Sequence, residues 1–319
     1  MRPHGPFPKT CLPTCMWFST TSPTKHKFAT VTPPYRGTTC MGHFVSCALV
    51  VMLLIGCRAT RTIPWPALAN QQAAGTGTAF YTQAAAYSWQ QRDSLALAWL
   101  LAGQSPRWQS RFVKIKVQTT DSTTGKTIRG HYYASPDYIS LGTHTQWARI
   151  PLTPMTAQRL ADTLHCFLPT PTMVDAIYQQ ASHRPAPLPL FAFRDSTPTF
   201  YHHHLMIQGQ LTMLYGTQRP RLVAGIKKDV VVTGALSQTN RPNRVAIYGW
   251  HQPNGTPIQP LYTGHVNWYV DYSHGIRLIY QTIWVNGRRM HYREVMQHPV
   301  YHRLLCKGIA CNPWRYPER

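Results

Sequence analysis

Acidic side chains are scarce in this chain of 319 residues, which has 10 Asp and Glu against 32 Lys and Arg and a formal charge of +22. So strong an excess of positive charge predicts an anionic partner, such as an acidic cell-envelope polymer or an anionic membrane surface. The basic residues are dispersed, however, and the chain lacks both a run of five Lys or Arg and a nucleic-acid-binding motif. The sequence therefore argues against nucleic acid as the partner.

The chain also lacks an apolar run of the roughly 20 residues that a membrane-spanning helix needs. Its apolar block at residues 44–56, FVSCALVVMLLIG, has the length of the hydrophobic region of a signal peptide. The block ends in LIGC, and this resembles the lipobox of bacterial lipoproteins, in which Cys57 would be lipidated. A buried helix is the alternative, but the polar segment that follows favours a tether. We expect an exported, membrane-anchored lipoprotein facing the periplasm or the cell exterior.

These features divide the chain into a signal and lipobox region at 1–57, a flexible tether at 58–78 and a single domain at 79–319. Residues 1–40 fit neither a signal nor a fold, so Met41 is an alternative start and 1–40 need not be translated. In the other alternative, basic residues of this segment form a long N-terminal region of the signal. Removing 1–57 takes away five basic residues and no acidic one, which leaves a charge of +17.

Three cysteines remain after Cys57. Cys306 and Cys311 are close enough in sequence to close a small disulfide loop in an oxidising compartment. Cys166 is then the odd thiol: it is either a buried, inert residue or a nucleophile. The nucleophile hypothesis depends on its place before a predicted helix, whose N-terminus would lower the thiol pKa. Nothing in the spacing of His202, His203 and His204, or of other ligands, predicts a metal or cofactor.

Local patterns predict an α+β fold, with a helical hairpin and an N-terminal helix packed on a mainly antiparallel sheet. Apolar residues favour a helix over 79–103, while alternation at 111–120 and 127–135, around the turn DSTTGK, indicates a β-hairpin. Thr153-Pro154 and Thr170-Pro171 are typical helix starts, with Pro in the first turn. Segments 245–250 and 276–285 are expected to be strands, and Asn286-Gly287 predicts a hairpin turn. Between those two strands we expect a long loop.

That loop and its borders hold the densest set of reactive side chains in the sequence. The stretch Asp271-Tyr272-Ser273-His274-Gly275-Ile276-Arg277 combines a carboxylate, a hydroxyl, an imidazole and a guanidinium. Strand alternation places Ser273 and His274 on opposite faces, so they are poor partners for each other. His274 could act as general acid or base, with Asp271 as its orienting group and Ser273 or Cys166 as nucleophile. Arg277 could bind an anionic group.

Tyr272, His251 and Trp250 complete the candidate substrate-binding residues. The resulting hypothesis is an enzyme that catalyses hydrolysis or acyl transfer on envelope material. A non-catalytic protein that binds a glycan or peptide in the same loop is the alternative. A third interpretation is structural: the aromatic residues, including Trp268 and Tyr269, are core and rim residues, and Asp271 holds a turn or pairs with Arg277.

Two resemblances bear on this choice. SHGIR at 273–277 is similar to the Ser-His-Gly-Cys-Ile/Val-Arg motif of L,D-transpeptidases, exported enzymes that cross-link peptidoglycan. The nucleophilic Cys is missing between Gly275 and Ile276, which argues against that activity here. Segments that include IYGWH, PIQPLY and YVDYSHGIRLI also resemble a family of exported bacterial proteins over most of residues 110–300. This second resemblance implies one module and bacterial export, and it brings no activity with it.

Overall fold

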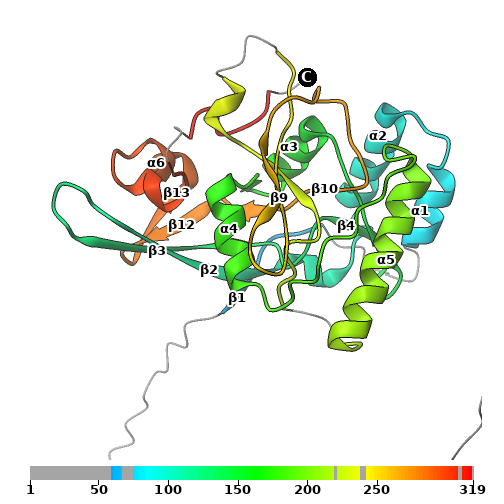
Figure 1. The fold of residues 1–319 in the computed structure, drawn as a ribbon, viewed down its shortest axis with the longest axis horizontal. Coiled ribbons are helices and arrows are strands. Elements are labelled where there is room, and N and C mark those ends of the chain that lie inside the picture. Colours follow the sequence, from blue (N-terminus) through cyan, green and yellow to red (C-terminus); the bar gives the residue numbers. More distant parts are fainter. Residues whose placement is uncertain (1–58, 67–74, 219–220, 238–241, 308–310, 318–319) are drawn as a thin grey trace, which may run out of the picture. The chain divides into compact units, whose positions relative to one another are not determined.

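The computed structural model describes residues 59–66, 75–218, 221–237, 242–307 and 311–317. The described residues belong to one compact unit, and the predictions for the signal region, Met41 and Cys57 concern residues outside them. The predicted α+β class is confirmed, because helices pack around sheets whose strands are mainly antiparallel (Figure 1). None of the described helices is long and apolar enough to cross a membrane.

The largest sheet joins segments from both halves of the chain. Its strands are β1 (Thr60–Thr62), β2 (Arg111–Thr120), β3 (Thr127–Ala134), β6 (Cys166–Phe167), β11 (Ile279–Tyr280), β12 (Thr282–Val285) and β13 (Arg288–His291). The predicted hairpin of β2 and β3 is confirmed, with Thr120 opposite Thr127. The Asn286-Gly287 turn joins β12 to β13, and both of its residues have the positive φ that this turn requires.

A second sheet is built around the stretch that carries the candidate site. It runs in the order β10 (His274–Gly275), β7 (Lys228–Val231), β8 (Ala246–His251) and β9 (Pro257–Tyr262). The prediction of one long loop after β8 is wrong in part, because β9 folds back on β8 as a hairpin. Its alternation of half-buried and exposed residues is that of an edge strand with one face in water. A third sheet pairs β4 (Ser140–Gly142) with β5 (Trp147–Arg149).

The predicted helix at 79–103 is two helices, α1 (Gly77–Gln83) and α2 (Trp89–Leu101). Ser88 starts the second helix: its side chain accepts a hydrogen bond from the backbone of Gln91, whose side chain accepts one from the backbone of Ser88 in return. This reciprocal capping satisfies two backbone N–H groups at the new helix start, and so it stabilises the break.

Both Thr-Pro helices form as predicted, as α3 (Pro154–Thr163) and α4 (Pro171–Gln180). Thr153 and Thr170 cap them by accepting hydrogen bonds from the backbone N–H groups of Thr156 and Met173. Their connection also adds strand β6 to the large sheet. The remaining helices are α5 (Thr197–Tyr215) and α6 (Tyr292–Gln297), with short 3₁₀ helices at 107–110, 234–236 and 301–304.

The flexible tether predicted at 58–78 is partly a folded segment. β1 pairs with β2, and the Ile63 side chain is buried in the main core cluster. The sequence signal for this strand is weak. It consists of a β-branched Thr-Ile pair after an arginine, without an alternation of apolar and polar residues. At the other end of the chain, Cys306 and Cys311 form the predicted disulfide.

Candidate functional site

Asp271 is the centre of the predicted site and lies in a tight turn. One carboxylate oxygen, Oδ1, accepts hydrogen bonds from the backbone N–H (2.8 Å) and the hydroxyl of Ser273. The other, Oδ2, accepts from Arg194 Nη2 at 3.1 Å and from the Tyr269 hydroxyl at 3.3 Å. Asp271 is buried, while the Arg194 side chain is 43% exposed. The arginine therefore lies between the carboxylate and solvent.

The local electrostatics keep Asp271 ionised. Burial alone would raise its pKa, but the neighbouring His274, the hydrogen bonds from Ser273 and the nearby Lys228 lower the pKa to about 2. Ser273 is fully buried and donates to Asp271, not to His274. This agrees with the expectation that Ser273 and His274 are poor partners. As folded, the Ser273 hydroxyl is a turn-forming group.

His274 follows in β10, which pairs with β7 in parallel. Its Nε2 lies 3.9 Å from Asp271 Oδ1, and neither ring nitrogen has a hydrogen-bond partner among the described residues. Burial lowers its pKa to about 4, although the Asp271 charge opposes that shift. A neutral, buried imidazole beside an ionised carboxylate could accept a proton, but this one does not contact solvent.

The structure corrects the predicted roles of Arg277 and Tyr272. The Arg277 guanidinium donates to the carbonyls of Ser135 and Val223 at 2.8 Å and lies 3.5 Å from Asp229. The Tyr272 hydroxyl is hydrogen-bonded to the backbone of Leu190. Both side chains are 1% exposed, so both hold distant segments together and neither is available to a substrate. Sequence spacing could not reveal partners that lie far away in the chain.

Cys166 lies in the predicted connection between α3 and α4, but its surroundings do not favour the nucleophile hypothesis. It lies in β6, 3% exposed, and its Sγ donates to the Leu164 carbonyl at 3.3 Å. Burial raises the thiol pKa well above its ordinary value, so the expected lowering by the start of α4 does not occur. No hydrogen bond or ion pair found in the described part of the chain joins Cys166 to the Asp271 turn. Its features are those of the buried, inert residue that was the first of the two interpretations.

His251 has its polar partner away from the Asp271 turn, and Trp250 is a core residue. The Asp175 Oδ1 atom of α4 is 3.1 Å from His251 Nε2 and accepts from the Tyr248 hydroxyl at 2.8 Å. The His251 ring stacks on Tyr178, with 4.3 Å between ring centroids. Trp250 is buried in the core, in edge contact with Tyr272. These contacts account for the aromatic residues of β8 as packing groups, and the predicted common groove of all four substrate-binding residues does not form.

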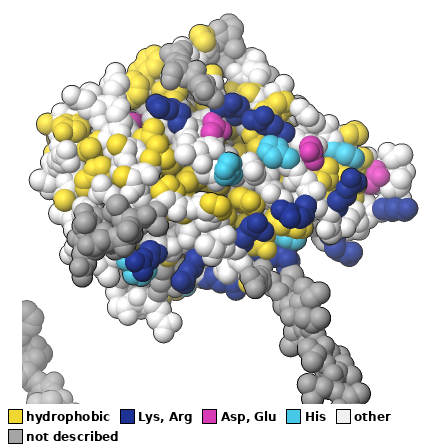
Figure 2. Space-filling model, turned by 180° about the vertical axis from the view of Figure 1, so that it is seen from behind, with side chains coloured by type: hydrophobic (Ala, Val, Ile, Leu, Met, Phe, Trp, Pro, Cys, Tyr) yellow, Lys and Arg dark blue, Asp and Glu magenta, His cyan; other side chains and the backbone are white. Residues whose placement is uncertain are grey.

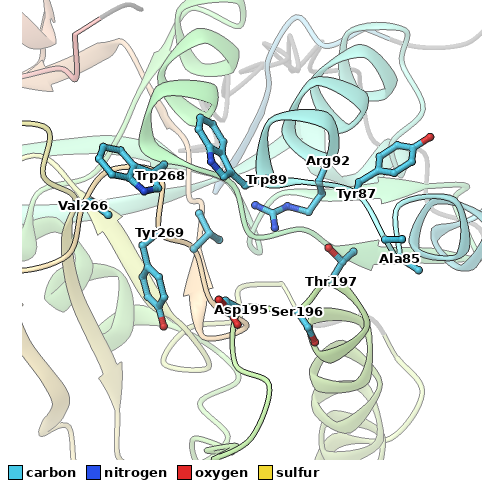
Figure 3. Close-up of a pocket in the computed structure, with 12 residues that line it drawn as sticks. Ala85, Tyr87, Trp89, Arg92, Asp195, Ser196, Thr197, Val266, Trp268 and Tyr269 are labelled. Carbon is cyan, nitrogen blue, oxygen red and sulfur yellow. The ribbon is translucent and has the colours of Figure 1, made fainter.

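An aromatic hollow of about 490 Å³ opens beside the Asp271 turn. Figure 3 shows Trp268 and Tyr269 on one side of it, Tyr87 on the opposite side, and Trp89 between them beside Arg92. The polar part of its lining includes Asp195 and Ser196. The hollow has the size of many small-ligand sites. We call the set Tyr87, Trp89, Trp268 and Tyr269 the aromatic groove.

The aromatic groove is joined to the predicted site by one residue. Tyr269 lines the groove, and its hydroxyl donates to Asp271. Sequence reasoning named Trp268 and Tyr269 as rim aromatics and missed Tyr87 and Trp89. Those two lie at the break between α1 and α2, about 180 residues earlier in the chain, and the prediction of one continuous helix concealed that break.

The three consecutive histidines do not share a ligand position. His203 faces the core, with Nε2 3.0 Å from the Leu188 carbonyl and Nδ1 2.9 Å from Lys227 Nζ, whereas His204 contacts Arg149. His202 is exposed. Within the described ranges, no cluster of three His, Cys, Asp or Glu side chains could hold a metal ion.

Comparison of the chain with protein-family models, with curated proteins and with solved structures found no match.

Proposed function

We propose that this is an exported, lipid-anchored envelope protein whose domain binds a glycan chain in the aromatic groove. One observation carries the proposal: four aromatic side chains from two distant segments line an open hollow, while Asp271, Ser273 and His274 are buried beside it. This corresponds to the binding alternative of the sequence analysis. The groove, however, uses residues of the α1–α2 break together with the predicted loop.

The chemistry of the aromatic groove suits a sugar ring. Aromatic faces pack well against flat apolar surfaces, and the C–H faces of pyranose rings are such surfaces. Trp268 is 43% exposed and Tyr87 is 36% exposed, so both rings are available before a ligand arrives. Asp195 and Ser196 at the border provide hydrogen-bonding groups for sugar hydroxyls. Arg92, which also lines the hollow, is held by Asp93 in an ion pair at 3.0 Å.

Titration of the full-length protein with N-acetylchitotetraose, followed by tryptophan fluorescence and calorimetry, tests this proposal. Trp268→Ala should weaken binding at least about tenfold, because one stacking surface is lost. Tyr262→Ala is the matched control: Tyr262 is 44% exposed and does not line the groove, so this variant should bind like the wild type. Equal affinity of wild type and Trp268→Ala would refute the proposal.

Hydrolysis or acyl transfer on envelope material is the second candidate function. The contact of the Tyr269 hydroxyl with Asp271 favours it, because a ligand that moved Tyr269 would reach the Asp271 carboxylate and then His274. In that case, Asp271→Asn should abolish turnover of purified cell wall while groove binding of the oligosaccharide persists. If the wild type produces no soluble fragments from cell wall and attaches none to it, binding alone is the function.

The location of the protein is tested separately through Cys57. In a bacterial host, Cys57→Ser should release the protein from the membrane fraction, because lipidation requires the thiol. A protein that stays in the membrane fraction after this change is not anchored by Cys57.

A further inference from the structure

A second concave surface lies on the large sheet, away from the aromatic groove. It is a hollow of about 780 Å³ on one face of β2, β3 and the β12–β13 turn. Lys114, Lys116, Arg129, His131 and Trp284 supply its charged and aromatic lining, and none of the lining residues is acidic. We call these five residues the cationic face. Figure 2 shows Lys and Arg gathered toward the side of the molecule on which the β2–β3 hairpin lies.

The strand register places these side chains together. Lys114 and Lys116 alternate with core residues along β2, so both point to the same side of the sheet. Across the ladder, Lys116 is opposite His131, and His131 is opposite Trp284. Directly opposed residues of neighbouring strands have adjacent side chains. The cationic face is therefore fixed by backbone hydrogen bonds and does not depend on a loop conformation.

Trp284 forms the floor of this surface and holds cations around it. Its ring stacks on His131, with 4.9 Å between centroids. The guanidinium groups of Arg61 and Arg289 lie 5.5 Å and 5.9 Å from the ring centroid. Such cation–π contacts orient arginine side chains and lower the entropy that they lose when they bind an anion. Burial and, after it, the Lys114 charge lower the His131 pKa to about 4.

We propose that the cationic face binds an acidic polysaccharide whose carboxylate or phosphate groups contact Lys116, Arg129 and their neighbours. A linear polymer can lie in the hollow on this face of the sheet, whereas a planar lipid surface does not enter it. Insertion into a membrane would require exposed large hydrophobic side chains. None of the large hydrophobic side chains of β2, β3, β12 or β13 is strongly exposed. The Trp284 ring already stacks on His131 and has the Arg61 and Arg289 guanidinium groups near it, so a nucleic-acid base would have to compete with them for the ring.

This site is independent of the aromatic groove, and the two make different demands on the ligand. The groove suits neutral sugar rings, whereas the cationic face recognises charge. Binding at the cationic face should therefore weaken steeply as salt increases, because charge–charge contacts are screened. Groove binding of N-acetylchitotetraose should change little with salt. Failure of one proposal leaves the other standing.

The experiment measures binding of polygalacturonate to the full-length protein by calorimetry at low salt. The double variant Lys116→Gln/Arg129→Gln should bind roughly tenfold more weakly, since two charges that face the ligand are lost. The double variant Arg107→Gln/Arg159→Gln removes the same charge from two exposed positions outside the cationic face, and it should bind like the wild type. Trp268→Ala should also retain polygalacturonate binding.

Three results would overturn the proposal. Equal weakening by both double variants would mean that only net charge matters. A single-stranded oligonucleotide that binds more tightly than polygalacturonate, with the same dependence on Lys116 and Arg129, would identify a different polymer. Phosphatidylglycerol vesicles that bind through these residues while polygalacturonate does not would identify a membrane surface.

Discussion

His274 provides the sharpest test of the buried polar centre, because its protonation is linked to folding. Its imidazole is buried and its pKa is lowered from 6.5 to about 4. Between these values the unfolded chain binds a proton that the folded chain does not bind, so the free energy of unfolding falls as the pH falls. From pH 7 to pH 5 this difference amounts to about 2 kcal/mol. Above pH 7 the contribution of His274 to the pH dependence vanishes.

The test variant is His274→Leu. It removes the titrating imidazole, which has no hydrogen-bond partner within the described residues. The wild type should therefore lose about 2 kcal/mol more than this variant between pH 7 and pH 5. Urea unfolding of the full-length proteins at both pH values, followed by tryptophan fluorescence, measures the difference. His202→Leu, at an exposed position of α5, should keep the wild-type pH dependence. If wild type and His274→Leu lose the same stability, His274 is not a buried neutral histidine.

Three further outcomes are expected. Arg277→Ala should lower the free energy of unfolding by about 3–5 kcal/mol, measured by urea unfolding, because it leaves the buried Asp229 without its ion pair; a loss below about 1 kcal/mol would contradict the structural role. Cys166 should react with a maleimide slowly in the folded protein and rapidly in urea, as measured by mass spectrometry, because the thiol is buried. Fast labelling without urea would contradict this and would support the nucleophile hypothesis. Cys306→Ser/Cys311→Ser should lower the free energy of unfolding by about 2 kcal/mol, a modest value because the disulfide closes a short loop. An unchanged midpoint of urea unfolding would show that the disulfide does not stabilise the fold.

The elements that sequence patterns predicted correctly are those encoded within a few residues. The Thr-Pro helix starts depend on one side chain and the backbone three residues later. The Asn286-Gly287 hairpin depends on two residues that tolerate positive φ. The helix break at Ser88 was also encoded locally, by a Ser and a Gln three residues apart, but the apolar composition around it masked this pattern.

The candidate site was only partly predictable, because the contacts and burial of its side chains depend on residues far away in the chain. The sequence grouped Asp271 with His274, and the structure places their side chains 3.9 Å apart without a hydrogen bond between the two side chains. It could not show that Arg194 covers the carboxylate or that Arg277 is held by Ser135 and Val223. Each of these contacts joins segments far apart in the chain, and no local periodicity records them. For the same reason, Tyr87 and Trp89 were not recognised as neighbours of Trp268.

The pairing of β1 with β2 would limit how far the domain could act from a lipid attached at Cys57. Only three peptide units separate Cys57 from Thr60, the first residue of β1, and they span at most about 11 Å. If Cys57 carries the lipid, the domain stays close to the membrane surface, because no long flexible linker separates the two. Its ligands would then be polymers that come to the membrane, and material in a distant layer of the envelope would be out of reach.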